Sequence, residues 1–227
     1  MSYEVAMTIT PSDIKQVIAS RSSKVDDAEA ALCEALVLIK FGGELNPELV
    51  TRIVAVAVKS DLKLIEWVAP IVCALTELYS SARSAICDLS RSKNVIARLC
   101  AIYALSPKLD DGFVVNILKK LVYDHKSIKV RTAAIDWIGR HNKKQFSNLL
   151  DAALEVERNE KVRKLISSEV ALLNFGYVVE RNNNGGYITV VGSFGRVSTV
   201  VENRDIERLS DSEIFELYLP KIVASRI

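Results

Sequence analysis

The segment Val130-Arg131-Thr132-Ala133-Ala134-Ile135 is the strongest indication of the fold, because two other segments match it at a regular distance. Residues 97–102 read ARLCAI, and residues 162–167 read VRKLIS. The arginines of the three segments are 33 and then 32 residues apart, and each is followed by small or apolar residues. A fixed spacing of this size is typical of stacked helical hairpins, in which each repeat supplies one pair of helices.

Apolar residues recur at helical spacing on both sides of these segments, which predicts amphipathic helices separated by short breaks. In the repeated region we expect helices over residues 94–105, 111–123, 129–139, 144–157 and 160–175. Closer to the N-terminus, helices are expected to begin near residues 11 and 26 and to span about residues 47–59, 61–79 and 82–89. Residues 1–181 are therefore expected to form one helical domain.

The pattern changes after residue 182. Residues 182–186 are rich in Asn and Gly, and residues 187–191 and 196–201 are rich in β-branched side chains, which predicts a β-hairpin. Ser210-Asp211-Ser212-Glu213 then resembles a capping box that starts a last helix. The expected fold is thus all-α, an α-solenoid of stacked antiparallel helix pairs, with a hairpin and a final helix over residues 182–227 as a C-terminal cap.

Composition supports a helical protein. Only 9 Gly and 5 Pro occur in 227 residues, too few turn residues for a β-sandwich or barrel of this size. The longest apolar run, residues 67–75, is about half the ~20 residues of a membrane-spanning helix, so no membrane association is expected. The N-terminus lacks the basic lead and apolar core of a signal peptide. Cys33, Cys73, Cys87 and Cys100 lie in apolar helical contexts, which favours buried, reduced thiols and a cytoplasmic protein.

The repeated helices resemble the HEAT-repeat family of α-solenoids. The residues that carry the resemblance are Lys129-Val130-Arg131-Thr132-Ala133-Ala134 and Lys161-Val162-Arg163, similar to the valine-arginine start of that family's second helix. The resemblance covers about residues 91–175, is only architectural for residues 10–90 and leaves out the hairpin and last helix. The repeat is also shorter than the family's ~40–47 residues. The resemblance implies binding of another macromolecule along a curved surface.

Charge is unevenly distributed along the chain. Residues 1–90 carry a net charge of −4, residues 91–181 one of +7 and residues 182–227 one of −1. A basic middle section indicates where an anionic partner would bind, but it does not identify that partner. Arg98, Arg131 and Arg163 allow two interpretations: they either bind carbonyls or carboxylates within the repeats, or contact anionic groups of a partner. Candidate partner-binding residues are Lys119, Lys120, Lys126, Lys129, Arg131, Arg140, Lys143, Lys144, Arg163 and Lys164.

No pattern of residues indicates catalysis. The sequence has no Cys-x-x-Cys or His-x-x-x-His, and its two histidines, His125 and His141, lie at expected helix ends. The segment Gly192-Ser193-Phe194-Gly195 superficially resembles a phosphate loop but lacks the Lys-Ser/Thr ending, so we interpret it as a hairpin turn. We expect no metal, no cofactor and no enzymatic activity.

One catalytic alternative is nevertheless open. Some HEAT-like proteins of about this size resemble alkylpurine DNA glycosylases, which place an acidic residue, tryptophans and arginine around a damaged nucleotide. This chain offers Asp136, Trp137 and Arg140, with Trp67 further away. Trp137 shares the apolar stripe of Val130, however, which favours a place in the core.

The function that the sequence favours is a non-enzymatic protein-binding scaffold: an adaptor, an assembly factor or an inhibitor such as an immunity protein. Its partner would be a protein with an acidic patch. The alternative is a nucleic-acid-binding HEAT-like protein, whose affinity would fall steeply with salt. A third hypothesis is self-assembly, because the ends of solenoids can stack.

Overall fold

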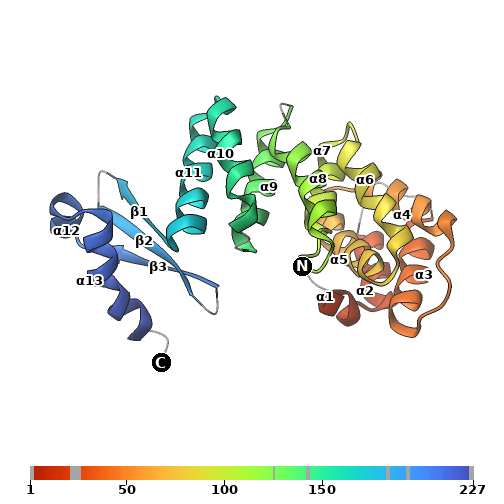
Figure 1. The fold of residues 1–227 in the computed structure, drawn as a ribbon. Coiled ribbons are helices and arrows are strands. Elements are labelled where there is room, and N and C mark those ends of the chain that lie inside the picture. Colours follow the sequence, from red (N-terminus) through yellow and green to blue (C-terminus); the bar gives the residue numbers. More distant parts are fainter. Residues whose placement is uncertain are drawn as a thin grey trace. The chain divides into compact units, whose positions relative to one another are not determined.

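The computed structural model describes residues 3–20, 27–124, 126–141, 144–182, 185–192 and 195–224. The protein is mostly helical, with a small three-stranded antiparallel sheet near the C-terminus (Figure 1). The chain divides into two compact units, Met1–Ala134 and Ile135–Ile227. Helix α9 (Ile128–Arg140) runs across that division. Within the described ranges, no helix has the length and apolar character needed to cross a bilayer.

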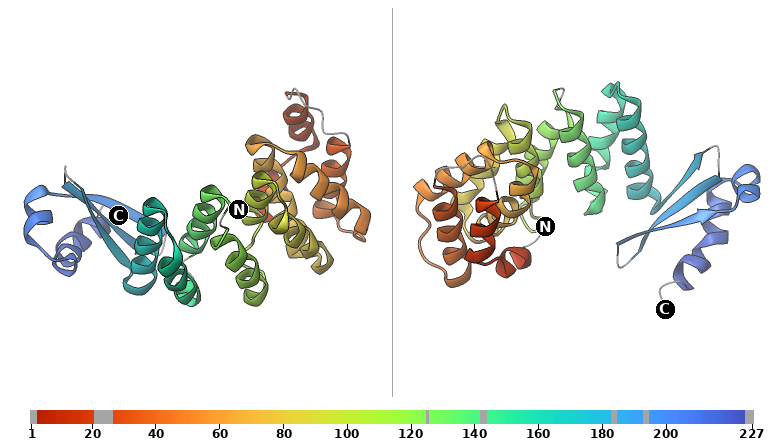
Figure 2. Two further views of the ribbon diagram at one scale, coloured as in Figure 1. Left: turned by 90° about the horizontal axis from the view of Figure 1, so that it is seen from above. Right: turned by 180° about the vertical axis from the view of Figure 1, so that it is seen from behind.

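The first unit is built from helices, which Figure 2 shows from two further directions. In chain order they are α1 (Tyr3–Thr8), α2 (Pro11–Ala19), α3 (Ala28–Phe41), α4 (Pro47–Lys59), α5 (Leu62–Leu78), the 3-10 turn η1 (Ser80–Ala82), α6 (Arg83–Arg91), α7 (Val95–Tyr103) and α8 (Asp111–Val122).

Most of these helices begin at a polar residue whose side chain accepts a hydrogen bond from a backbone amide of the first turn. Thr10 and Asp13 form a full capping box at the start of α2, and Asn46 caps α4 ahead of Pro47. Such caps supply partners for amides that have none inside the helix. The helix starts expected near residues 11 and 47 are therefore confirmed.

The core of the first unit lies around α5. This helix continues through Pro70, and its residues from Val68 to Thr76 are all buried. Helices pack on their neighbours in the chain and also on the helix after next: α3 contacts α5, α4 contacts α6, α5 contacts α7 and α6 contacts α8. Helix α5 also contacts α1, α2 and α4, which places it at the centre of this unit.

The second unit combines helices with the sheet. After the 3-10 turn η2 (Lys144–Phe146) come α10 (Ser147–Val156), α11 (Glu160–Phe175), β1 (Tyr177–Asn182), β2 (Gly185–Gly192), β3 (Gly195–Val201), α12 (Asn203–Arg208) and α13 (Asp211–Ala224). The strand order is β1-β2-β3, and both pairs are antiparallel. Ile188 pairs with Val179 on one side and with Thr199 on the other.

The sheet has helices on both faces. On one face, Ile188, Val190 and Val201 form a core with Ile206 of α12 and with residues of α13, namely Ile214, Tyr218 and Ile222. On the other face, α11 packs against β1 and β2. Arg196 of β3 binds Glu169 of α11 there through both carboxylate oxygens, and the Glu169 side chain is only 4 % exposed. A hairpin alone is marginal in water, and this double cover stabilises it.

The predicted hairpin is confirmed, but it belongs to a three-stranded sheet. Strand β1 was not expected, since residues 177–181 were assigned to the helical part of the chain. The signal was present: Gly176 ends α11 in the left-handed conformation, with φ 80°, and Tyr177-Val178-Val179 follow it. Glycine at this position is a common helix stop, and aromatic and β-branched residues favour a strand.

Candidate partner-binding surface

Three hexapeptides have the same local structure in successive helical pairs. They read KNVIAR at residues 93–98, KSIKVR at 126–131 and RNEKVR at 158–163. In each, a basic residue precedes a polar cap, and the arginine follows the cap by four positions. The cap oxygens of Asn94, Ser127 and Asn159 all accept backbone amide hydrogen bonds. The sequence spacing of 33 and 32 residues thus corresponds to a repeated helix start.

The arginine of each hexapeptide binds backbone carbonyls in the turn before its own helix or in the last turn of the preceding helix. Arg98 donates to the Ser92 carbonyl over 2.7 Å, and Arg131 to the Asp124 carbonyl over 2.8 Å. Arg163 donates to two carbonyls, those of Leu154 at 2.8 Å and Glu157 at 2.9 Å. Carbonyls at a helix end lack partners within the helix, so these arginines close the hairpins. The interpretation of this arginine column as internal stitching agrees with these contacts.

Arg98 also joins two hairpins of the first unit. Its Nε lies 2.6 Å from Oδ2 of Asp124, and the two side chains are only 7 % and 9 % exposed. Asp124 lies in the turn between α8 and α9, whereas the Ser92 carbonyl lies in the turn between α6 and α7. One buried guanidinium therefore holds the two turns next to each other.

This ion pair determines the charge of the surface around it. Asp124 is the one acidic residue between positions 119 and 131, and its carboxylate is directed inward to Arg98. Four exposed lysines remain at this hairpin end, and we call them the basic turn: Lys119, Lys120, Lys126 and Lys129. Among the residues that the structure describes, none of the four forms an ion pair with a carboxylate.

Interaction with the helix dipole explains the positions of only some lysines of the basic turn. Lys119 and Lys120 lie in the last turn of α8, where positive charge interacts favourably with the helix dipole. Lys129 lies in the first turn of α9, and this first turn contains no acidic residue. A cation at that end opposes the dipole. The position of Lys129 therefore favours a role outside the helix.

The other predicted residues belong to the second unit. Arg140 is exposed and forms an ion pair of 2.8 Å with Asp136 one helical turn earlier. Lys164 is exposed, while Arg163 is half-buried against its carbonyls. Lys144 begins η2. Lys143 and His125 lie outside the described residues.

The residues of the catalytic alternative lie in different surroundings. Trp137 is 6 % exposed, as its apolar stripe predicts, and its ring contacts His141 at 4.3 Å and Phe146 at 6.3 Å between centroids. Asp136 is engaged by Arg140 on the surface. Trp67 lies in the first unit, on α5.

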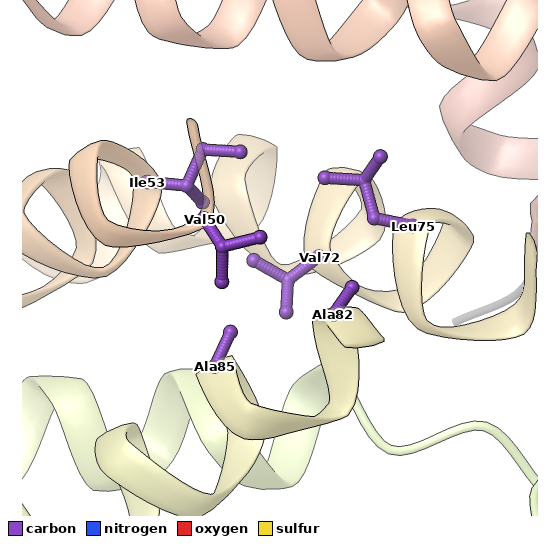
Figure 3. Close-up of a pocket in the computed structure, with 6 residues that line it drawn as sticks. All are labelled: Val50, Ile53, Val72, Leu75, Ala82 and Ala85. Atoms are coloured by element: carbon purple, nitrogen blue, oxygen red, sulfur yellow. The ribbon is translucent and has the colours of Figure 1, made fainter. Parts of the chain in front are cut away.

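The first unit also contains a small apolar cavity. It is lined by side chains of α4, α5, η1 and α6, namely Val50, Ile53, Val72, Leu75, Ala82 and Ala85 (Figure 3). Its volume of about 10 Å³ is close to the minimum for one water molecule, and an apolar lining offers a water no partners. It is a packing defect. Among the residues that the structure describes, no three His, Cys, Asp or Glu side chains gather as metal ligands.

The cysteines are free thiols, and two of the four are fully buried. Burial raises the pKa of Cys73 to about 12, with Glu77 adding to the shift, and burial alone raises the pKa of Cys100 to about 12. Cys33 and Cys87 are half-buried, so the expectation of four buried thiols is confirmed only for Cys73 and Cys100.

We expect Cys73 and Cys100 to resist iodoacetamide at about pH 8.5 in the native protein and to react in urea, because the thiolate is the nucleophile. The unfolded chain ionises its thiols from about pH 8.5 upward, whereas these two stay protonated until about pH 12 when folded. Folding stability should therefore fall as pH rises between these values. Mass spectrometry of alkylated peptides checks the first result, and urea titrations at increasing pH check the second. Rapid native labelling of Cys100 would contradict its burial.

Sequence reasoning named Lys126 but missed its counterparts at the first position of the other two hexapeptides. Lys93 and Arg158 are exposed at the place that Lys126 occupies in its own hairpin. Comparison of the segments one residue before each cap would have found them. No protein-family model, no curated protein and no solved structure matches this chain. The HEAT-repeat resemblance stays a prediction.

Proposed function

We propose that this chain is a non-enzymatic protein-binding scaffold of the α-solenoid type, which binds an acidic protein partner through a partly basic surface. Two observations support the architecture: helices of the first unit pack on the helix after next, and the arginine of each hexapeptide closes its own hairpin. The first kind of contact, between successive helical pairs, is typical of solenoids. Free cysteines favour a cytoplasmic site of action.

The observation that carries the binding proposal is the inward direction of Asp124. Because Arg98 binds this carboxylate, none of the basic-turn residues Lys119, Lys120, Lys126 and Lys129 forms an ion pair with a described carboxylate. A patch of one sign attracts a partner of the opposite sign and fixes its orientation. The roles consistent with this surface are those of an adaptor, an assembly factor or an inhibitor of the immunity-protein kind.

The test compares two double variants of equal charge change. Lys126→Glu with Lys129→Glu reverses half of the basic turn, and Lys59→Glu with Lys63→Glu reverses two exposed lysines of α4 and α5. Each protein is immobilised and exposed to a lysate of the native host, with and without nuclease. We expect a protein that the wild type and the control retain and that the basic-turn variant loses, with an affinity at least about tenfold weaker.

The same experiment decides between the two partner classes. Binding to nucleic acid would disappear after nuclease treatment, and a labelled duplex would bind with an affinity that falls steeply as salt increases. Binding to an acidic protein would survive nuclease and respond less to salt. Equal retention of all ligands by the basic-turn variant would contradict the proposal.

A further inference from the structure

Strand β3 forms one edge of the sheet, and its backbone pairs only with β2 among the residues described in the second unit. In an edge strand, alternate N–H and C=O groups point away from the sheet and are available to another strand. The outer side of β3 (Gly195–Val201) therefore presents a row of main-chain donors and acceptors.

Strand β1 forms the other edge of the sheet, and it carries a side-chain link to the helices that follow the sheet. On β1, Arg181 donates to the carbonyls of Ile206 at 3.3 Å and Leu209 at 3.0 Å and binds Asp211, so it ties the α12–α13 connection to that strand. Proteins usually protect an edge with charge, proline or a covering element. Strand β3 contains no proline, and its single charged residue, Arg196, is bound to Glu169.

We propose that β3 pairs antiparallel with β3 of a second copy of this chain, across a two-fold axis at Ser198. This register overlaps all seven residues of the strand and places Val197 opposite Thr199 of the second copy. Such β-branched neighbours stabilise a strand pair. Because Glu169 neutralises Arg196 in each copy, no unbalanced like charges meet across the axis. A charged strand from another protein would find no opposite charge on β3.

Self-pairing would turn two three-stranded sheets into one of six strands. It would also cover part of Val200, which is 66 % exposed and lies beside its cross-strand neighbour Tyr187, 45 % exposed. The area involved is far below the ~1,600 Å² of a standard interface. We therefore expect a weak dimer, with a dissociation constant on the order of 10–100 µM.

The test measures self-association of the full chain by sedimentation equilibrium, from about 1 to about 500 µM. Ser198 is exposed, and its hydroxyl contacts only that of Thr189 among the described residues, at 2.8 Å. Ser198→Lys and Ser198→Glu should each weaken the dimer about tenfold, because they place like charges opposite each other. An equimolar mixture of the two variants should recover wild-type association, since it pairs Lys with Glu.

Exposed Ser84 on α6 gives the matched control. Ser84→Lys and Ser84→Glu carry the same charge changes on a helix of the first unit and should leave the dimer unchanged. Hydrogen exchange of the wild type adds a readout without substitutions: β3 amides should exchange more slowly at high protein concentration. A wild type that stays monomeric throughout, a mixture that does not recover, or equal weakening by the Ser84 variants would each overturn the proposal.

Discussion

Gly139→Ala is expected to destabilise the second unit by about 3 kcal/mol, the range found when a buried ion pair is broken. A Cβ on residue 139 would lie 1.9 Å from Oε2 of Glu169 and 2.3 Å from Nη2 of Arg196. An alanine at this position would therefore push the ends of the Glu169 and Arg196 side chains aside, and Glu169 has little room to move because its side chain is only 4 % exposed. Alanine favours the helix by about 1 kcal/mol over glycine, which is too little to offset separation of the pair. Thermal unfolding should shift down by about 6–12 °C.

Gly112→Ala is the matched control, because Gly112 also lies within a helix, α8. A Cβ added at residue 112 would lie 3.1 Å from Oδ1 of Asp110, so it fits after a small shift of that side chain. We expect a change in stability within about 1 kcal/mol of zero. Equal losses for the two variants would show that the ion pair is not the cause.

Arg98→Ala should lower the free energy of unfolding by about 3–5 kcal/mol, because it leaves the carboxylate of Asp124 buried without its partner. The Arg98 side chain is 7 % exposed and that of Asp124 is 9 % exposed, so solvent screens the charges little. The variant also leaves the Ser92 carbonyl without the guanidinium donor. Urea unfolding followed by circular dichroism measures the loss.

A double-mutant cycle isolates the contribution of the pair. Asp124→Asn in the Arg98→Met background removes both charges, and this double variant should be less destabilised than the sum of the single variants. A strictly additive result would show that the two side chains stabilise the fold independently. Arg131→Ala, at the same position of the next hairpin, should cost less, about 1 kcal/mol, because its half-buried side chain is bound to a carbonyl.

The helical architecture was largely readable from the sequence because helix starts and apolar stripes are local signals. Asn94 and Asn159 cap helices where the pattern placed them, and Trp137 lies in the core as its stripe predicts. Strand β1 was missed because its six residues follow a long helix without a break other than Gly176.

The sequence did not show which partners the long charged side chains would bind. Arg98 meets Asp124, which is 26 positions further along the chain, and Glu169 meets Arg196, 27 positions away. Neither pairing leaves a local pattern, because tertiary packing alone brings the partners together. The sequence therefore grouped Arg131 and Arg163 with the surface lysines, although their guanidinium groups bind carbonyls of their own hairpins.

In the repeated hexapeptide, different residues stabilise the hairpin and face the solvent. Its cap and its arginine close the hairpin, while its first position, held by Lys93, Lys126 and Arg158, stays exposed. Residues at that position can change without disturbing the hydrogen bonds that hold the helices. The first position of the motif is thus suited to protein engineering. A substitution there could introduce a new binding specificity in one hairpin at a time while the helices keep their packing.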